Sequence, residues 1–328
     1  MLCLGIETTA HTFGASVVTG EGKILSEVRD MYTTTEGGMI PNEVKKHHLK
    51  IGDKVIEDAL TQANVKKEDI DFVALSNAPG LAPCLLAGME IAKRWALRLE
   101  IPLVPVNHIC AHLEIGKLLT NAKDPIFVFV SGANTQIIAL EGGRYRVFGE
   151  TLCVGIGNAL DKFGREVGLG FPAGPKIEEL AKRGKYVELP YAVKGMDVAF
   201  SGIITKAGIM VKSGKYKLED ICYSLQETLF AMVTEITERA LAHCDKDEVL
   251  VIGGVAANSR FKEMLETMCL ERNAKYYAAP LRYAGDNAAM IAWLGIMYMN
   301  SGYKPLKLEE IDILPKERSD DIDVFWVL

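Results

Sequence analysis

The pair of histidines at positions 108 and 112 is the first feature of this sequence that suggests metal chemistry. His108 and His112 lie in "VNHICAHLEIG", residues 106–116, with apolar residues between them. On a helix, residues four apart share one face, with Cβ atoms roughly 6 Å apart. Imidazole nitrogens spaced in this way suit a first-row metal, which they bind at about 2 Å. Two histidines packed on a helix without a metal have the same spacing, so the pair alone leaves both interpretations open.

A third candidate ligand, Asp286, comes much later in the chain. The stretch "GDN" at residues 285–287 opens an apolar helical segment. Aspartate is common there as an N-cap, whose carboxylate accepts backbone N–H groups. A carboxylate held at a helix start is also a suitable third ligand beside two histidines. The sequence therefore predicts either a helix cap or a metal ligand at Asp286.

Three predicted strand ends carry the small residues that phosphate-binding turns use. They are residues 5–12, 130–136 and 251–261, rich in Gly, Ala, Thr, Ser and Asn. At glycine, backbone N–H groups can come close to an anion, and a following helix N-terminus adds a favourable dipole. Hairpin turns use the same residues, but three such turns together favour a nucleotide. None of them matches the P-loop or the G-x-G-x-x-G pattern.

Two carboxylates, Asp161 and Glu178, lie on helical stretches joined by a Gly/Pro loop within residues 149–181. An acidic side chain beside a nucleotide commonly accepts hydrogen bonds from the ribose hydroxyls. Acidic residues are also common on exposed helices, so surface charge is the alternative interpretation for each of them.

The elements that must position these residues follow a repeated pattern. A strand–turn–strand–strand start returns at residues 125–151, and helices and strands alternate after each copy. Strands are predicted at 1–8, 13–20, 24–31, 71–76, 102–107, 248–254 and 275–280, and helices at 42–63, 84–99, 218–243, 258–272 and from "GDN" onward. The pattern predicts a duplicated α/β fold of two lobes with a central cleft. We expect lobe I at residues 1–121, lobe II at 122–297, and a C-terminal segment, 298–328, that returns to lobe I.

The composition is that of a globular protein without a membrane span. Of the 328 residues, 49% are hydrophobic and 24% charged, and no apolar run reaches the ~20 residues that a span needs. The N-terminus has no basic region of a secretory signal, so we expect a cytoplasmic chain. The seven scattered cysteines contain no CxxC pair, which argues against a disulfide framework or a zinc finger.

The charge distribution is uneven. The net charge of −6 argues against a protein that coats nucleic acid by charge alone. Residues 176–217, however, hold nine Lys/Arg and four Asp/Glu, a local balance of 9 − 4 = +5. This basic segment is either a solvated face or a contact with a phosphate backbone.

A series of stretches, in order along nearly the whole chain, resembles the universal tRNA N6-adenosine threonylcarbamoyltransferase family. The similarity is to the archaeal and eukaryotic form, the catalytic subunit of the KEOPS complex, whose older name is O-sialoglycoprotein endopeptidase. The matching stretches are "GIETTAHT", "PVNHICAHLEIG", "VSGANTQ", "YRVFGETL", "GIGNALDKFGRE", "ELPYAVKGMD", "FSGI", "ICYSLQET", "EITERALAH" and "GGVAANSR". The resemblance implies the actin-like/Hsp70-like/sugar-kinase (ASKHA) fold, in agreement with the duplication.

The resemblance also implies the site residues. His108, His112 and Asp286 would bind one divalent metal, iron or zinc, with magnesium as an alternative. The nucleotide, threonylcarbamoyl-AMP or ATP, would contact Phe129, Val130, Ser131, Gly132, Ala133, Asn134, Asp161, Gly174, Glu178 and Asn258. The implied reaction moves the threonylcarbamoyl group to N6 of adenosine 37 in tRNAs that read ANN codons. The implied partners are tRNA and KEOPS-like subunits, namely a small kinase/ATPase subunit and a small dimerising subunit.

Several positions depart from the family pattern. Phe129 stands where the family has a tyrosine that is a further metal ligand, so here a water must take its place or the site loses a ligand. Other departures are Ala133, Ala173 and Ala288 in place of glycine and Leu86 in place of arginine. An alternative function is therefore a catalytically weakened nucleotide-binding scaffold subunit. A metalloprotease is disfavoured because residue 109 is Ile where the HExxH motif has its general-base Glu.

Overall fold

The computed structural model describes residues 1–34 and 39–326, and the chain divides into two compact units. Unit 1 comprises residues 1–118, 142–145 and 286–328, and unit 2 comprises residues 119–141 and 146–285. Unit 1 resumes at Asp286, earlier than the expected return at residue 298. The physical reason is that the helix beginning at residue 288 packs against the first sheet.

Unit 1 contains a five-stranded sheet with strand order β3-β2-β1-β4-β5. Its elements are β1 (Leu2–Glu7), β2 (Thr12–Thr19), β3 (Val28–Met31), α1 (Pro41–Ala63), β4 (Phe72–Ala78), α2 (Ala82–Leu99), β5 (Leu103–Asn107), α3 (His108–Thr120) and α10 (Ala288–Asn300), with short 3-10 turns at Lys67–Asp69, Leu308–Glu310 and Ser319–Asp321. β1 pairs antiparallel with β2 and parallel with β4. The last residues of α3, beyond residue 118, fall in unit 2.

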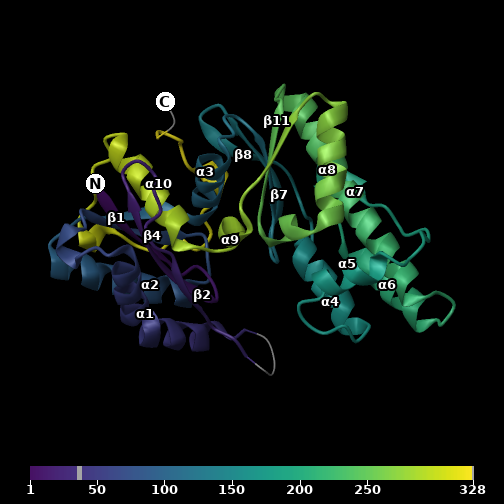
Figure 1. Ribbon diagram of the computed structural model, residues 1–328, viewed down its shortest axis with the longest axis horizontal. Helices are drawn as coiled ribbons and strands as arrows, with labels where there is room; N and C mark the ends of the chain where they lie inside the picture. The colour runs from purple at the N-terminus through teal and green to yellow at the C-terminus, as the bar shows by residue number, and fades with distance from the viewer. Residues whose placement is uncertain (35–38, 327–328) are drawn as a thin grey trace. The chain divides into compact units, whose positions relative to one another are not determined.

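Alternation of side chains along β1 and β4 explains how the first sheet is covered. Leu4, Ile6, Val73 and Leu75 pack into one core with residues of α1 and α2, while the intervening Gly5 faces α10 on the other side (Figure 1). A Cβ on Gly5 would lie only 2.3 Å from the carbonyl oxygen of Ala288. Glycine at this position therefore allows the first turn of α10 to rest directly on β1.

Unit 2 repeats this strand order in a second sheet, β12-β11-β6-β7-β8. Its elements are β6 (Ile126–Val130), β7 (Thr135–Glu141), β8 (Arg144–Glu150, begun in unit 1), α4 (Ile156–Glu166), α5 (Gly174–Ala181), β9 (Val193–Lys194), β10 (Asp197–Val198), α6 (Ser201–Lys212), α7 (Leu218–Cys244), β11 (Glu248–Ile252), a 3-10 turn (Gly254–Ala257), α8 (Ser259–Glu271), β12 (Lys275–Ala278) and α9 (Leu281–Ala284). In each sheet an antiparallel meander is followed by two strands added in parallel. The predicted duplication is therefore confirmed.

One predicted strand is shorter than expected. The sequence predicts a strand at residues 24–31, but β3 begins only at Val28, and Ile24 makes an isolated bridge with Val18. The reason is local: the Ser26 hydroxyl accepts the Val17 N–H, and the Ser16 hydroxyl donates to the Ser26 carbonyl. Side-chain hydrogen bonds thus interrupt the regular backbone ladder at this point, although Leu25 N–H still donates to the Val17 carbonyl.

In the described part of the chain, no helix combines the length and the apolar character that crossing a membrane requires.

Candidate functional site

The start of α3 is fixed by the residue before it. The Asn107 side-chain oxygen accepts the backbone N–H groups of Ile109 (2.9 Å) and Cys110 (3.2 Å), which satisfies amides that a helix start leaves without partners. Its amide nitrogen donates to Glu317 (3.1 Å), in the C-terminal segment. Because β5 ends at Asn107, His108 becomes the first residue of α3, and His112 follows one turn later.

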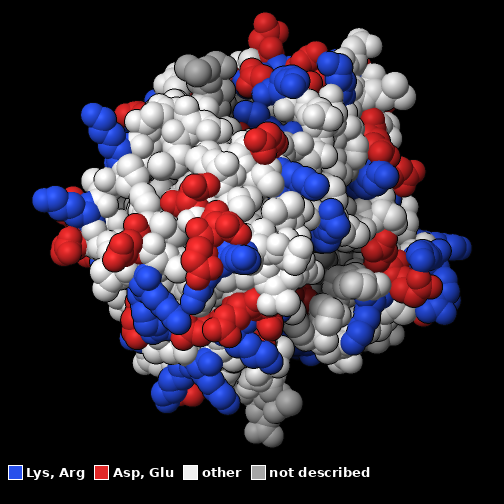
Figure 2. Space-filling model, turned by 60° about the vertical axis from the view of Figure 1, so that its left-hand side comes forward, with Lys and Arg blue, Asp and Glu red and all other residues white. Residues whose placement is uncertain are grey.

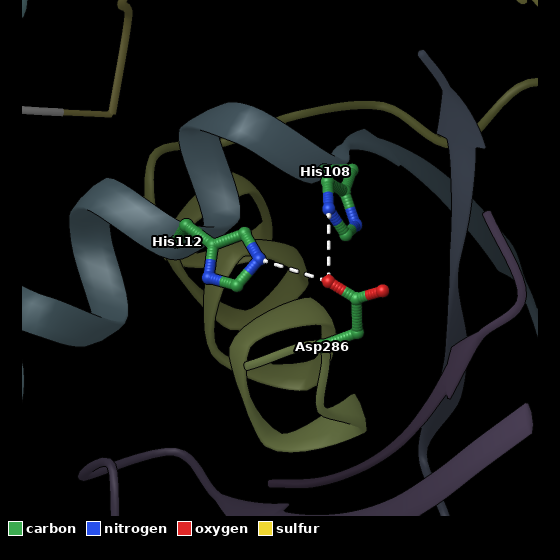
Figure 3. Close-up of side chains that lie close together, drawn as sticks. All are labelled: His108, His112 and Asp286. Carbon is green, nitrogen blue, oxygen red and sulfur yellow. Dashed lines mark ion pairs between the residues drawn. The ribbon is translucent and has the colours of Figure 1, made fainter. Parts of the chain in front are cut away.

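The two histidines and Asp286 come together in unit 1. The Nε2 atoms of His108 and His112 each lie 3.5 Å from the same oxygen, Asp286 Oδ1, and both rings point toward this carboxylate (Figure 3). The ring centroids are 4.7 Å apart at an interplanar angle of 85°. One donor atom of each residue lies within 4.8 Å of the other two, and the described residues contain no second group of this kind.

Glu7, at the end of β1, holds the His108 ring. Its Oε2 atom lies 3.0 Å from His108 Nδ1 and is fully buried. Because a carboxylate can only accept, Nδ1 carries a proton, so in the neutral ring Nε2 is the nitrogen whose lone pair could bind a metal. The backbone N–H of Thr9 donates to the other Glu7 oxygen (2.7 Å), as does its hydroxyl. A buried carboxylate behind a histidine is the usual outer partner of a metal-binding imidazole.

The electrostatics of the three groups are coupled. Burial acts to lower the pKa of His108, but the charge and hydrogen bond of Glu7 outweigh it and raise the pKa to about 9. Burial lowers the pKa of His112. Burial opposes ionisation of Asp286, yet the hydrogen bond from His112 and the charges of both histidines hold its pKa well below the usual range. In the metal-free protein the cluster therefore stabilises an ionised Asp286 carboxylate that faces a protonated His108 and a neutral His112.

Asp286 is not the helix cap that the sequence allowed. Asn287 is the N-cap of α10, and its side-chain oxygen accepts the Met290 N–H at 3.0 Å. The reason is that Asn287 occupies the last non-helical position before Ala288, so the Asp286 carboxylate is directed to the histidines instead.

The C-terminal segment contacts α3 a second time. Glu114, buried on α3, accepts the indole N–H of Trp326 at 2.8 Å and the hydroxyl of Tyr145. Lys117 lies 3.3 Å from the other oxygen of Glu114. Residues from the two ends of unit 1 therefore hold the helix that carries the histidines.

In unit 2, the turn between β6 and β7 is closed by its own hydrogen bonds. The Ser131 N–H donates to the Asn134 carbonyl, and the Asn134 N–H donates to the Ser131 hydroxyl (3.0 Å). The N-terminal amides of α4 donate to the carbonyls of Ser131 and Gly132. Phe129 and Val130, which lead into the turn, are buried in β6. The predicted nucleotide contacts at 129–134 thus form one packed turn against α4.

Gly253, just after β11, allows this turn to be approached closely. Its φ is +101°, and a Cβ there would lie 2.1 Å from the Val130 carbonyl oxygen. Both facts require glycine.

The other predicted nucleotide contacts lie on three helices of unit 2: Asp161 within α4, Gly174 and Glu178 in α5, and Asn258 just before α8. Asp161 Oδ1 accepts the Ala173 N–H (2.8 Å), and Glu178 Oε1 accepts the Ser259 N–H (2.9 Å) and its hydroxyl. Among the described residues, none donates a hydrogen bond to Asp161 Oδ2 or Glu178 Oε2. Asn258 is the N-cap of α8 and donates to Gln226.

A cavity of about 330 Å³ adjoins the turn in unit 2. It is lined by Ala133, Asn134, Thr135, Gln136, Glu150, Thr151, Cys153, Val154, Gly155 and Asn158. Only Ala133 and Asn134 of the predicted nucleotide contacts line this cavity.

Cys153, which lines the cavity, has an exposed thiol. Burial acts to raise the pKa of this thiol, but hydrogen bonds from Ser201 and Phe200 hold the pKa below its usual value.

Sequence reasoning missed the residues that hold the histidines. Glu7 and Thr9 entered only as part of a turn, and Asn107 not at all. A signal for Glu7 existed, since a carboxylate that ends the apolar run "LCLGI" is costly to bury unless it has a partner. Asn107 stands directly before a helical segment, where asparagine is a frequent cap.

The basic segment of residues 176–217 lies within unit 2, and several of its side chains have partners inside the chain. Lys182 pairs with Glu179, and Lys176 donates to the Leu169 carbonyl. Lys182, Arg183 and Lys185 are exposed. On the face drawn in Figure 2, acidic and basic side chains are interspersed, so no single sign of charge dominates there.

Solved structures with similar folds have low sequence identity to this chain. HypF from Thermococcus kodakarensis has a TM-score of 0.63 at 16% identity, over 92% of this chain and 48% of HypF. Component A of the (R)-2-hydroxyglutaryl-CoA dehydratase of Acidaminococcus fermentans has a TM-score of 0.54 at 16% identity, over 90% and 98%. The ROK hexokinase of Thermus thermophilus has a TM-score of 0.52 at 15% identity, over 92% and 100%. These likenesses confirm the predicted ASKHA fold.

Sequence relatives are much more similar. Proteins named tRNA N6-adenosine threonylcarbamoyltransferase from Thermococcus sibiricus and Thermococcus kodakarensis are 53% and 50% identical over 327 residues, 99% of this chain and 100% of each relative. A probable bifunctional tRNA threonylcarbamoyladenosine biosynthesis protein of Methanocaldococcus jannaschii is 49% identical, over 100% of this chain and 61% of that protein. The family model described as tRNA N6-adenosine threonylcarbamoyltransferase matches residues 23–293. Because these matches extend over nearly all of the sequence, the chain belongs to the tRNA N6-adenosine threonylcarbamoyltransferase family.

Proposed function

We propose that this chain transfers the threonylcarbamoyl group of threonylcarbamoyl-AMP to N6 of adenosine 37 in tRNAs that read ANN codons. The observation that carries the proposal is the cluster of two imidazoles and one carboxylate in unit 1, found in a chain half identical to transferases of that name. Such a cluster is suited to a reaction whose substrate presents phosphate and carbonyl oxygens.

The donor set fits one divalent metal. Nε2 of His108, Nε2 of His112 and a carboxylate oxygen of Asp286 would hold it, and imidazole donors favour iron or zinc over magnesium. When bound, the metal would supply Lewis acidity toward phosphate or carbonyl oxygens. Glu7 keeps the His108 proton on Nδ1, and Asn107 holds the start of α3, so the chain itself orients both imidazoles.

The nucleotide would be held by unit 2. The second oxygens of Asp161 and Glu178 are available to accept hydrogen bonds from ribose hydroxyls. A Cβ on Gly174 would meet no described atom within 4 Å, so the backbone at the start of α5 is open to a ligand. Phe129–Asn134 would contribute through the backbone of their turn, and Asn258 through the helix start that it caps. Either threonylcarbamoyl-AMP or ATP would use these contacts.

We further propose a cytoplasmic, KEOPS-like complex in which a small kinase/ATPase subunit and a small dimerising subunit accompany this chain. The bifunctional name of the Methanocaldococcus jannaschii relative supports a second activity beside the transferase, since this chain matches only 61% of that protein.

A transfer assay tests the proposed activity. The protein is mixed with threonylcarbamoyl-AMP and an ANN-reading tRNA, with and without partner subunits, and nucleosides from the digested tRNA are examined for N6-threonylcarbamoyladenosine. We expect the product with the wild-type protein and partners and its loss with Asp286→Asn, which keeps the size of the side chain. Absence of product with correctly folded, metal-loaded wild-type complex would refute the proposal and favour a scaffold role.

The basic segment is the proposed contact for tRNA in unit 2. With a net charge of −6, the chain cannot hold tRNA by general attraction, so local Lys/Arg contacts to phosphates must carry its share of binding. Replacing Lys182, Arg183 and Lys185 together with Ala should reduce the slope of log affinity against log salt by up to ~2–3. A matched triple substitution of Lys54, Lys66 and Lys67 in unit 1 should leave the slope unchanged. If both triple variants show the same slope of log affinity against log salt, the basic segment is only a solvated face and not a tRNA contact.

A further inference from the structure

Glu27, just before β3, and Arg29, within β3, contact the backbone on both sides of Asn287, the helix cap that follows Asp286. Glu27 Oε1 accepts the Ala288 N–H (3.1 Å), and Oε2 accepts the Ala289 N–H (2.8 Å). Arg29 Nη1 donates to the backbone carbonyl of Asp286 itself (3.2 Å). Glu27 and Arg29 lie 3.6 Å apart as an ion pair. A carboxylate and a guanidinium from one strand thus hold a single tight turn.

We propose that Glu27 and Arg29 are positioning residues that set the place and direction of the Asp286 carboxylate. The inference rests on the proposed metal-dependent function and adds two residues to it. Neither residue supplies a donor atom to the His108–His112–Asp286 cluster; both act through the Asp286 backbone and the first turn of α10.

Tight packing fixes the backbone of this turn in place. Asn287, Ala288 and Ala289 are fully buried. Gly5 allows α10 to rest on β1, with no room between them for a methyl group. Asp286 is the last residue before this packed region, and its side chain is 26% exposed. The side chain therefore depends on the preceding backbone for its direction, and Arg29 holds the carbonyl of that same residue.

The contacts of Glu27 are more than those of a helix cap. The N-cap function at α10 is already supplied by Asn287, which accepts the Met290 N–H. Glu27 adds a bidentate contact to two further amides, and its own backbone N–H donates to Gln62 of α1 (2.9 Å). The backbone of Glu27 is thus held by α1, and its carboxylate holds the first turn of α10. Its side chain is 11% exposed, so water competes little for these hydrogen bonds.

Cobalt binding tests the inference, because the visible spectrum of Co²⁺ depends on the number and geometry of its ligands. We would titrate the full-length metal-free protein with Co²⁺ and compare wild type, Glu27→Ala, Glu27→Gln and Arg29→Ala. Loss of an outer partner of a metal site typically weakens binding roughly 10–100-fold. We expect a weakening in this range for Glu27→Ala with an altered spectrum, a smaller one for Arg29→Ala, and partial rescue by Gln, which retains one acceptor oxygen.

The matched control is Asp53→Ala, also in unit 1. Asp53 accepts hydrogen bonds from Arg94 and Trp95, both at 2.8 Å, and has no contact with the Asp286 turn. It should lower the melting temperature of the metal-free protein without changing Co²⁺ affinity or spectrum. Wild-type affinity and spectrum in both Glu27→Ala and Arg29→Ala would overturn the inference while leaving the metal site in place. If Glu27→Ala does not fold, Arg29→Ala alone decides. Wild-type protein that binds no Co²⁺ would overturn the metal site and the inference together.

Discussion

The two sheets share one strand order but differ in what lies at the ends of their parallel strands. In unit 1 the ends of β1 and β5 present side chains, Glu7 and His108, that form hydrogen bonds with each other. In unit 2 the end of β6, the counterpart of β1, and the end of β11, the counterpart of β4, present backbone, the Ser131–Asn134 turn and Gly253. Ligands of α/β sheets commonly bind at the carboxyl ends of such strands. The two sheets thus place the proposed metal donors and the proposed nucleotide contacts at the carboxyl ends of strands, with side chains in unit 1 and backbone in unit 2.

Removing the metal donors should have the largest effect and tests the unit 1 side of this contrast. In the His108→Ala/His112→Ala variant, only Asp286 remains of the three donors, so we expect metal affinity to fall by more than the roughly 10–100-fold cost of losing an outer partner. Metal content of purified protein measured by mass spectrometry checks this. His47→Ala/His48→Ala, an adjacent pair on α1, serves as a control. Equal metal content in the double variant of α3 and in wild type would contradict the proposed site.

Adding one methyl group at Gly253 should have the next largest effect and tests the unit 2 side. An alanine there adopts an unfavourable φ of +101° and places Cβ 2.1 Å from the Val130 carbonyl oxygen. We expect the free energy of unfolding to fall by about 3 kcal/mol, as measured by chemical denaturation. The neighbouring Gly254→Ala is a close control, since its Cβ would meet no described atom within 4 Å. If the free energy of unfolding is the same for both variants, the end of β11 does not require the close approach of Gly253 to the Val130 carbonyl.

Loss of a ribose contact should have the smallest effect. Asp161→Ala removes a charge-assisted hydrogen bond worth ~1.5–3 kcal/mol, so calorimetry should show roughly 10–150-fold weaker ATP binding. Metal content should not change, because Asp161 lies in unit 2 and the three metal donors lie in unit 1. Asp161 also holds the Ala173 N–H, so Asp161→Asn, which can still accept that bond, separates the two roles. Full ATP affinity in Asp161→Asn and its loss in Asp161→Ala would assign Asp161 to loop structure alone.

Local spacing made part of this arrangement predictable. The histidine pair depends only on helical periodicity, and α1, α2, α7, α8 and α10 were predicted close to their observed bounds because their apolar patterns are regular. The duplication was visible because each meander ends in Gly-rich or small-residue turns. The family resemblance then connected Asp286 with the histidines, although the sequence alone left a helix cap equally open.

Long-range contacts could not be predicted in the same way. Glu27 and Ala288 are 261 positions apart in the chain, and nothing in either local pattern indicates that they meet. The late start of β3 depends on two serine hydroxyls, one that donates to a backbone carbonyl and one that accepts a backbone N–H, and strand propensity does not reveal such contacts. Asn107 likewise shows its second partner, Glu317, only once the chain is folded.

The attachment of α3 to the C-terminal segment has a practical consequence for protein preparation. Glu317 holds Asn107, and Trp326, two positions before the last residue, holds Glu114. Loss of residues 317–326 to a contaminating protease would remove both of these contacts with α3, although none of these residues belongs to a strand of either sheet. We expect such a sample to pass gel filtration and circular dichroism although the helix that carries His108 and His112 has lost both contacts. Intact mass should therefore accompany every metal measurement, and tags belong at the N-terminus behind a cleavable linker.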